Sequence, residues 1–172
     1  MRVLAAILTV VLTAPLLAQE PTPAPEIQRL GRLLVGGWRS IEKHEPGRIA
    51  PKGGSGRGSE RVDLGPGGMS LISDYRAVDP EGKFAAHTIF WWDTKEKAYR
   101  NLECSNRSTG GCHMGLWRWD GNDLVSHEEG IKMAFTDFTP KTYTFYMDAS
   151  TDGGAMARVM TIKFTKTEAI NR

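Results

Sequence analysis

Turn-forming residues interrupt the chain at short intervals from Ser59 onward, and this punctuation limits the possible fold more than any other feature. Asp79-Pro80-Glu81-Gly82 and Asp120-Gly121-Asn122-Asp123 are the clearest of these turns, because Gly, Pro, Asn and Asp favour turn conformations. The segments between the turns are too short for ordinary helices and have the composition of strands. The expected strands are 69–78, 83–92, 98–104, 112–119, 124–129, 132–138, 142–149 and 156–165.

This succession of eight or nine short strands predicts an all-β fold, an antiparallel meander closed into a small barrel of 8–10 strands. A parallel α/β fold is excluded because it needs a helix between successive strands. A single short helix is expected ahead of the strands, over 26–35, where Ile27, Leu30 and Leu34 recur at helical spacing. The segment 48–58 is rich in glycine and basic residues without an apolar period, so we expect a flexible loop there.

The first eighteen residues have the three parts of a secretory signal. Arg2 supplies a positive charge, 3–17 are almost entirely apolar, and Ala18 is a small residue at the exit. A retained membrane anchor is the alternative, but the apolar run is shorter than the roughly 20 residues of a spanning helix. We therefore expect a signal peptide at 1–18, a Pro-rich tether at 19–25 and one domain at 26–168, located in the periplasm or outside the cell with no stable membrane span.

Export changes how the two cysteines are interpreted. Cys104 and Cys112 flank a turn-rich linker, and an oxidising compartment permits a disulfide between them. We expect the bridge to join two strands of a hairpin, with the Cα atoms within roughly 7 Å. A pair of reduced, half-buried thiols is the alternative.

The charge balance and the motifs exclude several classes of function. The chain carries 22 Lys and Arg against 20 Asp and Glu, which argues against a dedicated nucleic-acid binder. It has no nucleophile elbow, phosphate-binding loop or metal-ligand motif, so no catalytic residue, metal or cofactor is assigned. His127 and Glu129 share a strand face and could form a metal site with His87 or His113, although an exposed polar face explains the same residues.

Four short motifs occur in a characteristic order along the chain. They are Leu33-Leu34-Val35-Gly36-Gly37-Trp38, Leu64-Gly65-Pro66-Gly67-Gly68, Ile89-Phe90-Trp91-Trp92-Asp93 and Trp119-Asp120-Gly121. This order resembles the uncharacterised lipocalin-like domain of secreted bacterial proteins, within the calycin superfamily of lipocalins and fatty-acid-binding proteins. The resemblance covers roughly 28–166 and implies a lipocalin-like barrel; the 48–58 segment and the two cysteines depart from it. Trp38 is interpreted as a structural plug of one barrel end, with a ligand contact as the alternative.

Both faces of the 83–92 strand are largely apolar, which a simple one-sided sheet does not need. A barrel with such a strand either is filled by its side chains or holds one hydrophobic or amphiphilic ligand. The function predicted is therefore an exported small-molecule binding protein. The alternatives are a hydrolase or isomerase, which a mutually close His, Asp and Arg would favour, and an envelope interaction protein without a ligand. The candidate ligand-binding residues are Arg76, His87, Trp92, His113, Trp117 and Tyr146, with Arg76 or His87 as polar anchors.

Overall fold

The computed structural model describes residues 21–47, 50–108, 110–150 and 154–167. The predicted signal peptide lies outside these residues. No helix within the described part of the chain is long and apolar enough to cross a membrane. The elements are α1 (Pro25–Leu34), β1 (Gly36–His44), β2 (Gly54–Leu64), a short 3-10 turn (Pro66–Gly68), β3 (Ser70–Asp79), β4 (Gly82–Asp93), β5 (Ala98–Ser105), β6 (His113–Asp120), β7 (Asp123–Glu128), β8 (Ile131–Thr136), β9 (Thr142–Ser150) and β10 (Met156–Lys166).

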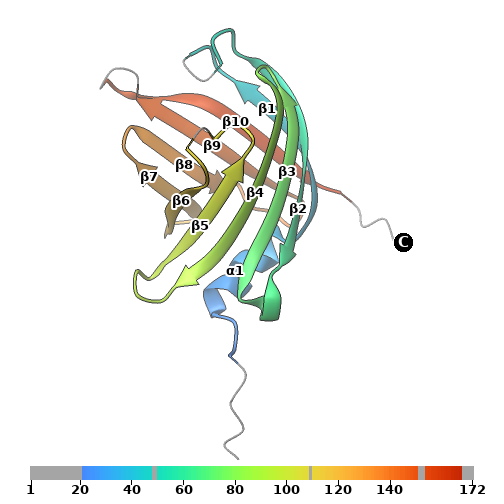
Figure 1. Cartoon of the computed structure of the whole chain (residues 1–172), viewed down its shortest axis with the longest axis vertical. Coiled ribbons are helices and arrows are strands. Elements are labelled where there is room, and N and C mark those ends of the chain that lie inside the picture. The colour runs from blue at the N-terminus through green and yellow to red at the C-terminus, as the bar shows by residue number, and fades with distance from the viewer. Residues whose placement is uncertain (1–20, 48–49, 109, 151–153, 168–172) are drawn as a thin grey trace, which may run out of the picture.

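The ten strands form one closed antiparallel barrel in which neighbours in the sequence are neighbours in space. The barrel closes where β10 pairs with β1, from Trp38 opposite Lys166 to His44 opposite Met160. Figure 1 shows α1 lying at one end of the barrel, while the β1–β2 and β3–β4 connections lie at the other. We call these the helix end and the far end. The predicted fold class, an all-β barrel with a short N-terminal helix, is confirmed.

The helix end is packed with large side chains. α1 buries Ile27, Leu30 and Leu34 toward the barrel, as the helical spacing of these residues requires. Trp38 is 1% exposed, and its Nε1 donates a hydrogen bond to the Leu34 carbonyl at 2.7 Å. The Tyr99 hydroxyl donates to the Glu26 carbonyl at 3.0 Å. These two bonds fix the helix across its end of the barrel.

The glycine-rich segment is not a loop throughout, and this part of the prediction is wrong. β2 begins at Gly54 and pairs with β1 along its length. A Cβ on Gly58 would lie 2.7 Å from the Ser40 Oγ and from the Tyr75 hydroxyl, and a Cβ on Gly56 would lie 2.7 Å from Glu42 Oε2. Glycine is therefore needed in β2 because polar side chains of the neighbouring strands occupy the interior beside it.

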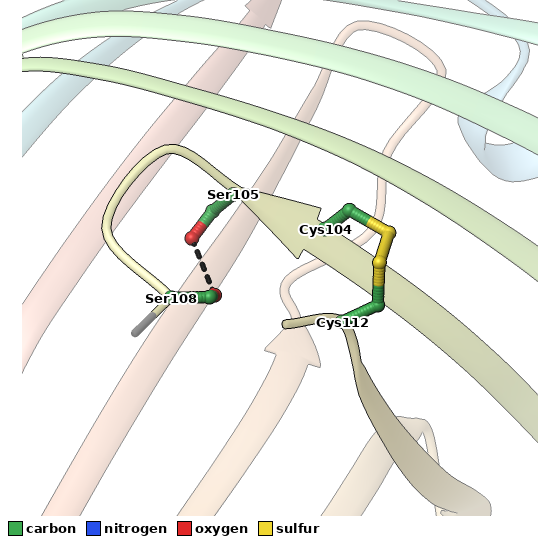
Figure 2. Close-up of a disulfide and its surroundings, with 4 residues drawn as sticks. All are labelled: Cys104, Ser105, Ser108 and Cys112. Atoms are coloured by element: carbon green, nitrogen blue, oxygen red, sulfur yellow. Dashed lines mark hydrogen bonds between the residues drawn. A yellow bond between two sulfur atoms is a disulfide. The ribbon is translucent and has the colours of Figure 1, made fainter. Parts of the chain in front are cut away.

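The two cysteines form the predicted disulfide, with their Cα atoms 4.2 Å apart. Figure 2 shows the bridge joining the end of β5 to the residue just before β6. The loop that it closes is further held by a 2.8 Å hydrogen bond between the hydroxyls of Ser105 and Ser108. The bridge lies at the far end, next to the last paired residues of this hairpin, Glu103 and His113.

Candidate functional site

The barrel interior is filled at the helix end and hollow toward the far end. The hollow part is a cavity of about 430 Å³, which lies within the range of small-molecule sites. Its lining is mostly aromatic and aliphatic, with a few polar groups. The lining residues are Glu60, Ser73, Tyr75, Phe84, Ala86, Thr88, Phe90, Asn101, Glu103, His113, Trp117, Glu128, Ile131, Met133, Phe135, Phe145, Met147, Met160, Ile162 and Phe164.

Two of the six predicted ligand-binding residues, His113 and Trp117, line this cavity. Trp117 is buried, and its Nε1 donates to Asn101 Oδ1 at 2.9 Å. Trp92 belongs to the aromatic packing of the helix end instead, where its ring meets Tyr99 edge-on at 5.1 Å. Its role as a ligand contact therefore has no support from the cavity lining.

The other three predicted residues point outward. Phe84 and Ala86 face the cavity, so alternation along the strand places His87 outside, where its Nδ1 lies 2.9 Å from Asp74 Oδ1. Arg76 is exposed on the outer face of β3. The Tyr146 ring is covered by the Arg158 guanidinium, 3.7 Å from its centroid. The structure does not bring these side chains to the cavity, so any interior anchor must come from other residues.

The polar groups at the far end of the cavity are Glu103, His113 and Glu128, which we call the acidic rim. His113 lies opposite Glu103 in the β5–β6 ladder, and its Nε2 lies 2.8 Å from Glu128 Oε1. Burial raises the pKa of Glu103, as does the charge of Glu128, while His113 opposes the shift. Neither glutamate was among the predicted site residues, although Glu103 shares its strand face with Tyr99 and Asn101.

Glu60 lies deeper in the barrel and is bound by two hydroxyls. Ser73 donates to its Oε1 at 2.5 Å, and Tyr143 donates to its Oε2. Burial raises the pKa of this carboxyl, and the two hydrogen bonds only partly offset the effect. Burial and the adjacent Glu60 also raise the pKa of Tyr143 well above its ordinary value. Both oxygens of Glu60 therefore already have partners within the protein.

A second polar cluster lies inside the barrel at the far end, where β1 and β3 end. Glu42, His44 and Asp79 each place one ligand atom within 4.8 Å of the others and could hold a metal ion. The protein already supplies positive charge here, because Arg107 binds both Asp79 oxygens at 2.6 and 2.8 Å. Burial alone would raise the pKa of Asp79, but the Arg107 hydrogen bonds hold it below its usual value.

Glu42 in this cluster is also satisfied internally. It lies 2.8 Å from His44 Nε2 and accepts a hydrogen bond from the Tyr75 hydroxyl. The burial of Tyr75 and its bond to Glu42 raise the pKa of this phenol far above its ordinary value. His44 Nδ1 is buried without a hydrogen-bond partner among the described residues. The cluster is thus a hydrogen-bonded network of the barrel interior, in which His44 Nδ1 has no partner among the described residues.

Comparisons with known proteins show the fold and not a family. No family model matches the sequence, and no curated protein matches it. The solved structure of Rv2717c from M. tuberculosis aligns with a TM-score of 0.61 and 8% identity, over 85% of this chain and 99% of that one.

Two further solved structures align with this chain. The S-type phycobiliprotein lyase CPES from Guillardia theta has a TM-score of 0.56 and 10% identity, over 83% and 93% of the two chains. A de novo designed fluorescence-activating β-barrel has a TM-score of 0.45 and 12% identity, over 80% and 96%. At these identities the likeness concerns architecture alone. The chain has the architecture of a closed, lipocalin-like antiparallel β-barrel.

Proposed function

We propose that this protein binds one small hydrophobic or amphiphilic molecule in the barrel cavity. The observation that carries the proposal is a cavity of about 430 Å³ with a largely apolar lining and a few polar groups gathered at one end. Pockets of this size and composition typically hold small ligands, since apolar walls supply affinity and a few polar groups orient the molecule. Ten strands also enclose a wider interior than the eight of the smallest barrels.

We further infer that binding takes place outside the cytoplasm. The signal-like first eighteen residues support this inference, and the Cys104–Cys112 bridge is compatible with it, because disulfides persist in oxidising compartments. The test is to express the full chain with its own N-terminus in a bacterial host. Export predicts a mature product that begins near Gln19 and lacks free thiols.

The binding test uses two alanines that are adjacent in sequence but lie on opposite faces of β4. Ala86 lines the cavity, whereas Ala85 is exposed on the outer face. Decanol and an uncharged aromatic dye are titrated against the protein, with tryptophan fluorescence and calorimetry as readouts. Ala86→Phe fills part of the cavity and should weaken binding at least ten-fold, whereas Ala85→Phe should leave it unchanged. Equal binding by wild type and a folded Ala86→Phe variant would contradict an interior site.

A hydrolase or isomerase is the second candidate, because His44, Asp79 and Arg107 lie together. These side chains do not line the cavity, and His44 is only 5% exposed. A molecule in the cavity would therefore not touch them, so the cluster cannot act on it directly. The binding function is better supported by the geometry.

A further inference from the structure

The ionisable groups that line the cavity are predominantly acidic. Those that can carry a charge near neutral pH are Glu60, Glu103, Glu128 and His113, and no lysine or arginine is among the described residues of the lining. Arg107 approaches the cavity wall, 5.2 Å from the centroid of the Phe84 ring. Its guanidinium is nevertheless engaged by both Asp79 oxygens and by the Gly82 carbonyl.

Glu103 is the least satisfied of the three cavity carboxylates. Glu60 accepts two hydroxyl donors, and Glu128 pairs with His113. Within the described part of the chain, the Glu103 side chain makes no hydrogen bond or ion pair, although it lies opposite His113. A half-buried carboxylate without a hydrogen-bond donor is unfavourable. A ligand that brings a cationic donor therefore gains more binding free energy at Glu103 than at Glu60 or Glu128.

A glycine on β6 brings the acidic rim close to the aromatic wall of the cavity. Gly115 faces the interior on β6, and a Cβ there would lie 2.5 Å from Asn101 Oδ1, 3.2 Å from Trp117 Nε1 and 3.5 Å from Glu128 Oε1. The glycine therefore keeps the hydrogen-bonded Asn101–Trp117 pair and the Glu128 carboxylate close together on one wall. The indole of Trp117 adds an aromatic surface to the cavity, which also favours a nearby cation.

We propose that the ligand is an amphiphile with a cationic head, a protonated amine held at Glu103 and Glu128, and an apolar tail directed toward Phe135 and Phe145. This inference rests on the proposed binding function and names the class of ligand for the same site. A fatty acid carries the opposite charge, and its carboxylate would meet two glutamates and no basic side chain of the described lining except His113. Like charges at close range exclude such a ligand by repulsion.

The test is a series of three ligands that share one ten-carbon chain, namely decylamine, decanol and decanoate, each kept below its micellar concentration at pH 7.5. We expect decylamine to bind at least ten-fold more tightly than decanoate, with decanol between them, by calorimetry and tryptophan fluorescence. If decanoate equals or exceeds decylamine, the cationic-head inference fails while the binding function stands. If none of the three binds, the proposed function itself fails.

A pair of variants locates the head group. Glu103→Gln should weaken decylamine about ten-fold and leave decanol within two-fold, because the amide keeps the shape and removes the charge. Glu129→Gln is the matched control, since Glu129 is an exposed residue of the adjacent turn and should change neither ligand. Melting temperatures confirm that both variants are folded. An equal loss of amine and alcohol binding in Glu103→Gln would show that Glu103 acts on the shape of the cavity, which would overturn its assignment as the anchor.

Discussion

The same strands build a packed interior at the helix end of the barrel and a hollow interior at the far end. β5 contributes Tyr99 to the helix end and Glu103 to the far end, and β6 contributes Trp119 and His113 in the same sense. At the helix end the Trp119 indole donates to the Tyr99 hydroxyl at 3.1 Å. At the far end the inward side chains, among them Ala86, Glu103 and His113, border the cavity. The cavity therefore arises from the choice of inward side chains along each strand.

If the helix end is packed and the far end is hollow, Trp38→Ala should cause the largest loss of stability. Trp38 is fully buried and meets Tyr143 edge-on with ring centroids 4.7 Å apart. We expect its loss to lower the free energy of unfolding by about 3–5 kcal/mol, measured by denaturant unfolding. Met147→Ala is the comparison at the cavity and should cost about 2 kcal/mol, the low end for a buried methionine, because that side chain already borders empty space. Equal costs would break the distinction between a packed and a hollow end.

At the far end, a covalent bond contributes stability that packing supplies at the helix end. The Cys104–Cys112 bridge joins residues with a sequence separation of 8. Replacing both cysteines by serine should lower the free energy of unfolding by about 2–3 kcal/mol through the entropy of the unfolded chain. Reductant should lower the melting temperature of the wild type to that of the double variant. The melting temperature of the double variant itself should not change. A wild type insensitive to reductant would show that the bridge adds no stability.

The glycines of β2 test whether the interior beside this strand has space for a side chain. In Gly58→Ala the new methyl group would lie 2.7 Å from the Ser40, Tyr75 and Arg76 oxygens, so we expect a loss of about 1–3 kcal/mol from overpacking. Gly110→Ala is the control, because no atom lies within 4 Å of its Cβ position, and it should stay within about 0.5 kcal/mol of wild type. Thermal and urea unfolding of the pair measure this difference. A neutral Gly58→Ala would mean that β2 tolerates side chains inside.

The smallest effect is expected for Glu60→Gln, which replaces a buried carboxyl between the two ends. Because burial raises the folded-state pKa of Glu60, the folded protein binds this proton more tightly than the unfolded chain. Its contribution to stability is thus present at low pH and is lost as the pH rises through the folded pKa. Glu60→Gln should melt a few degrees above wild type at pH 8, and the gap should close near pH 4. A constant gap across this range would point to altered hydrogen bonds instead of charge.

The spacing of turns and apolar residues predicted the helix and the strands from β3 to β10 to within about two residues. Of the other two strands, β1 is headed by the Gly36-Gly37-Trp38 motif, and β2 was not predicted because its first residues, 54–58, fall within the glycine-rich segment. β2 escaped detection because its glycines are dictated by the side chains of β1 and β3, and a local pattern does not contain this information. Only the paired structure shows which neighbours need the space.

The site was harder to predict than the fold because it depends on which strand face points inward. β5 carries polar residues on both faces, so an acidic residue such as Glu103 looks like an ordinary surface group. A residue known to face inward fixes the inward face of its whole strand. Trp38 is such a residue, and it places Ser40, Glu42 and His44 on the interior face of β1. The same alternation places His87 outside once Trp92 is assigned to the interior.

The pairing of β1 with β10 also determines when this molecule can become complete. These strands are the first and last of the barrel, and they form the seam that removes every free sheet edge. A ribosome must therefore finish β10 before the seam can form, and until then two unpaired edges remain available to other chains. A product that stops short of Met156 would keep both edges permanently, which makes premature termination an aggregation hazard for this architecture.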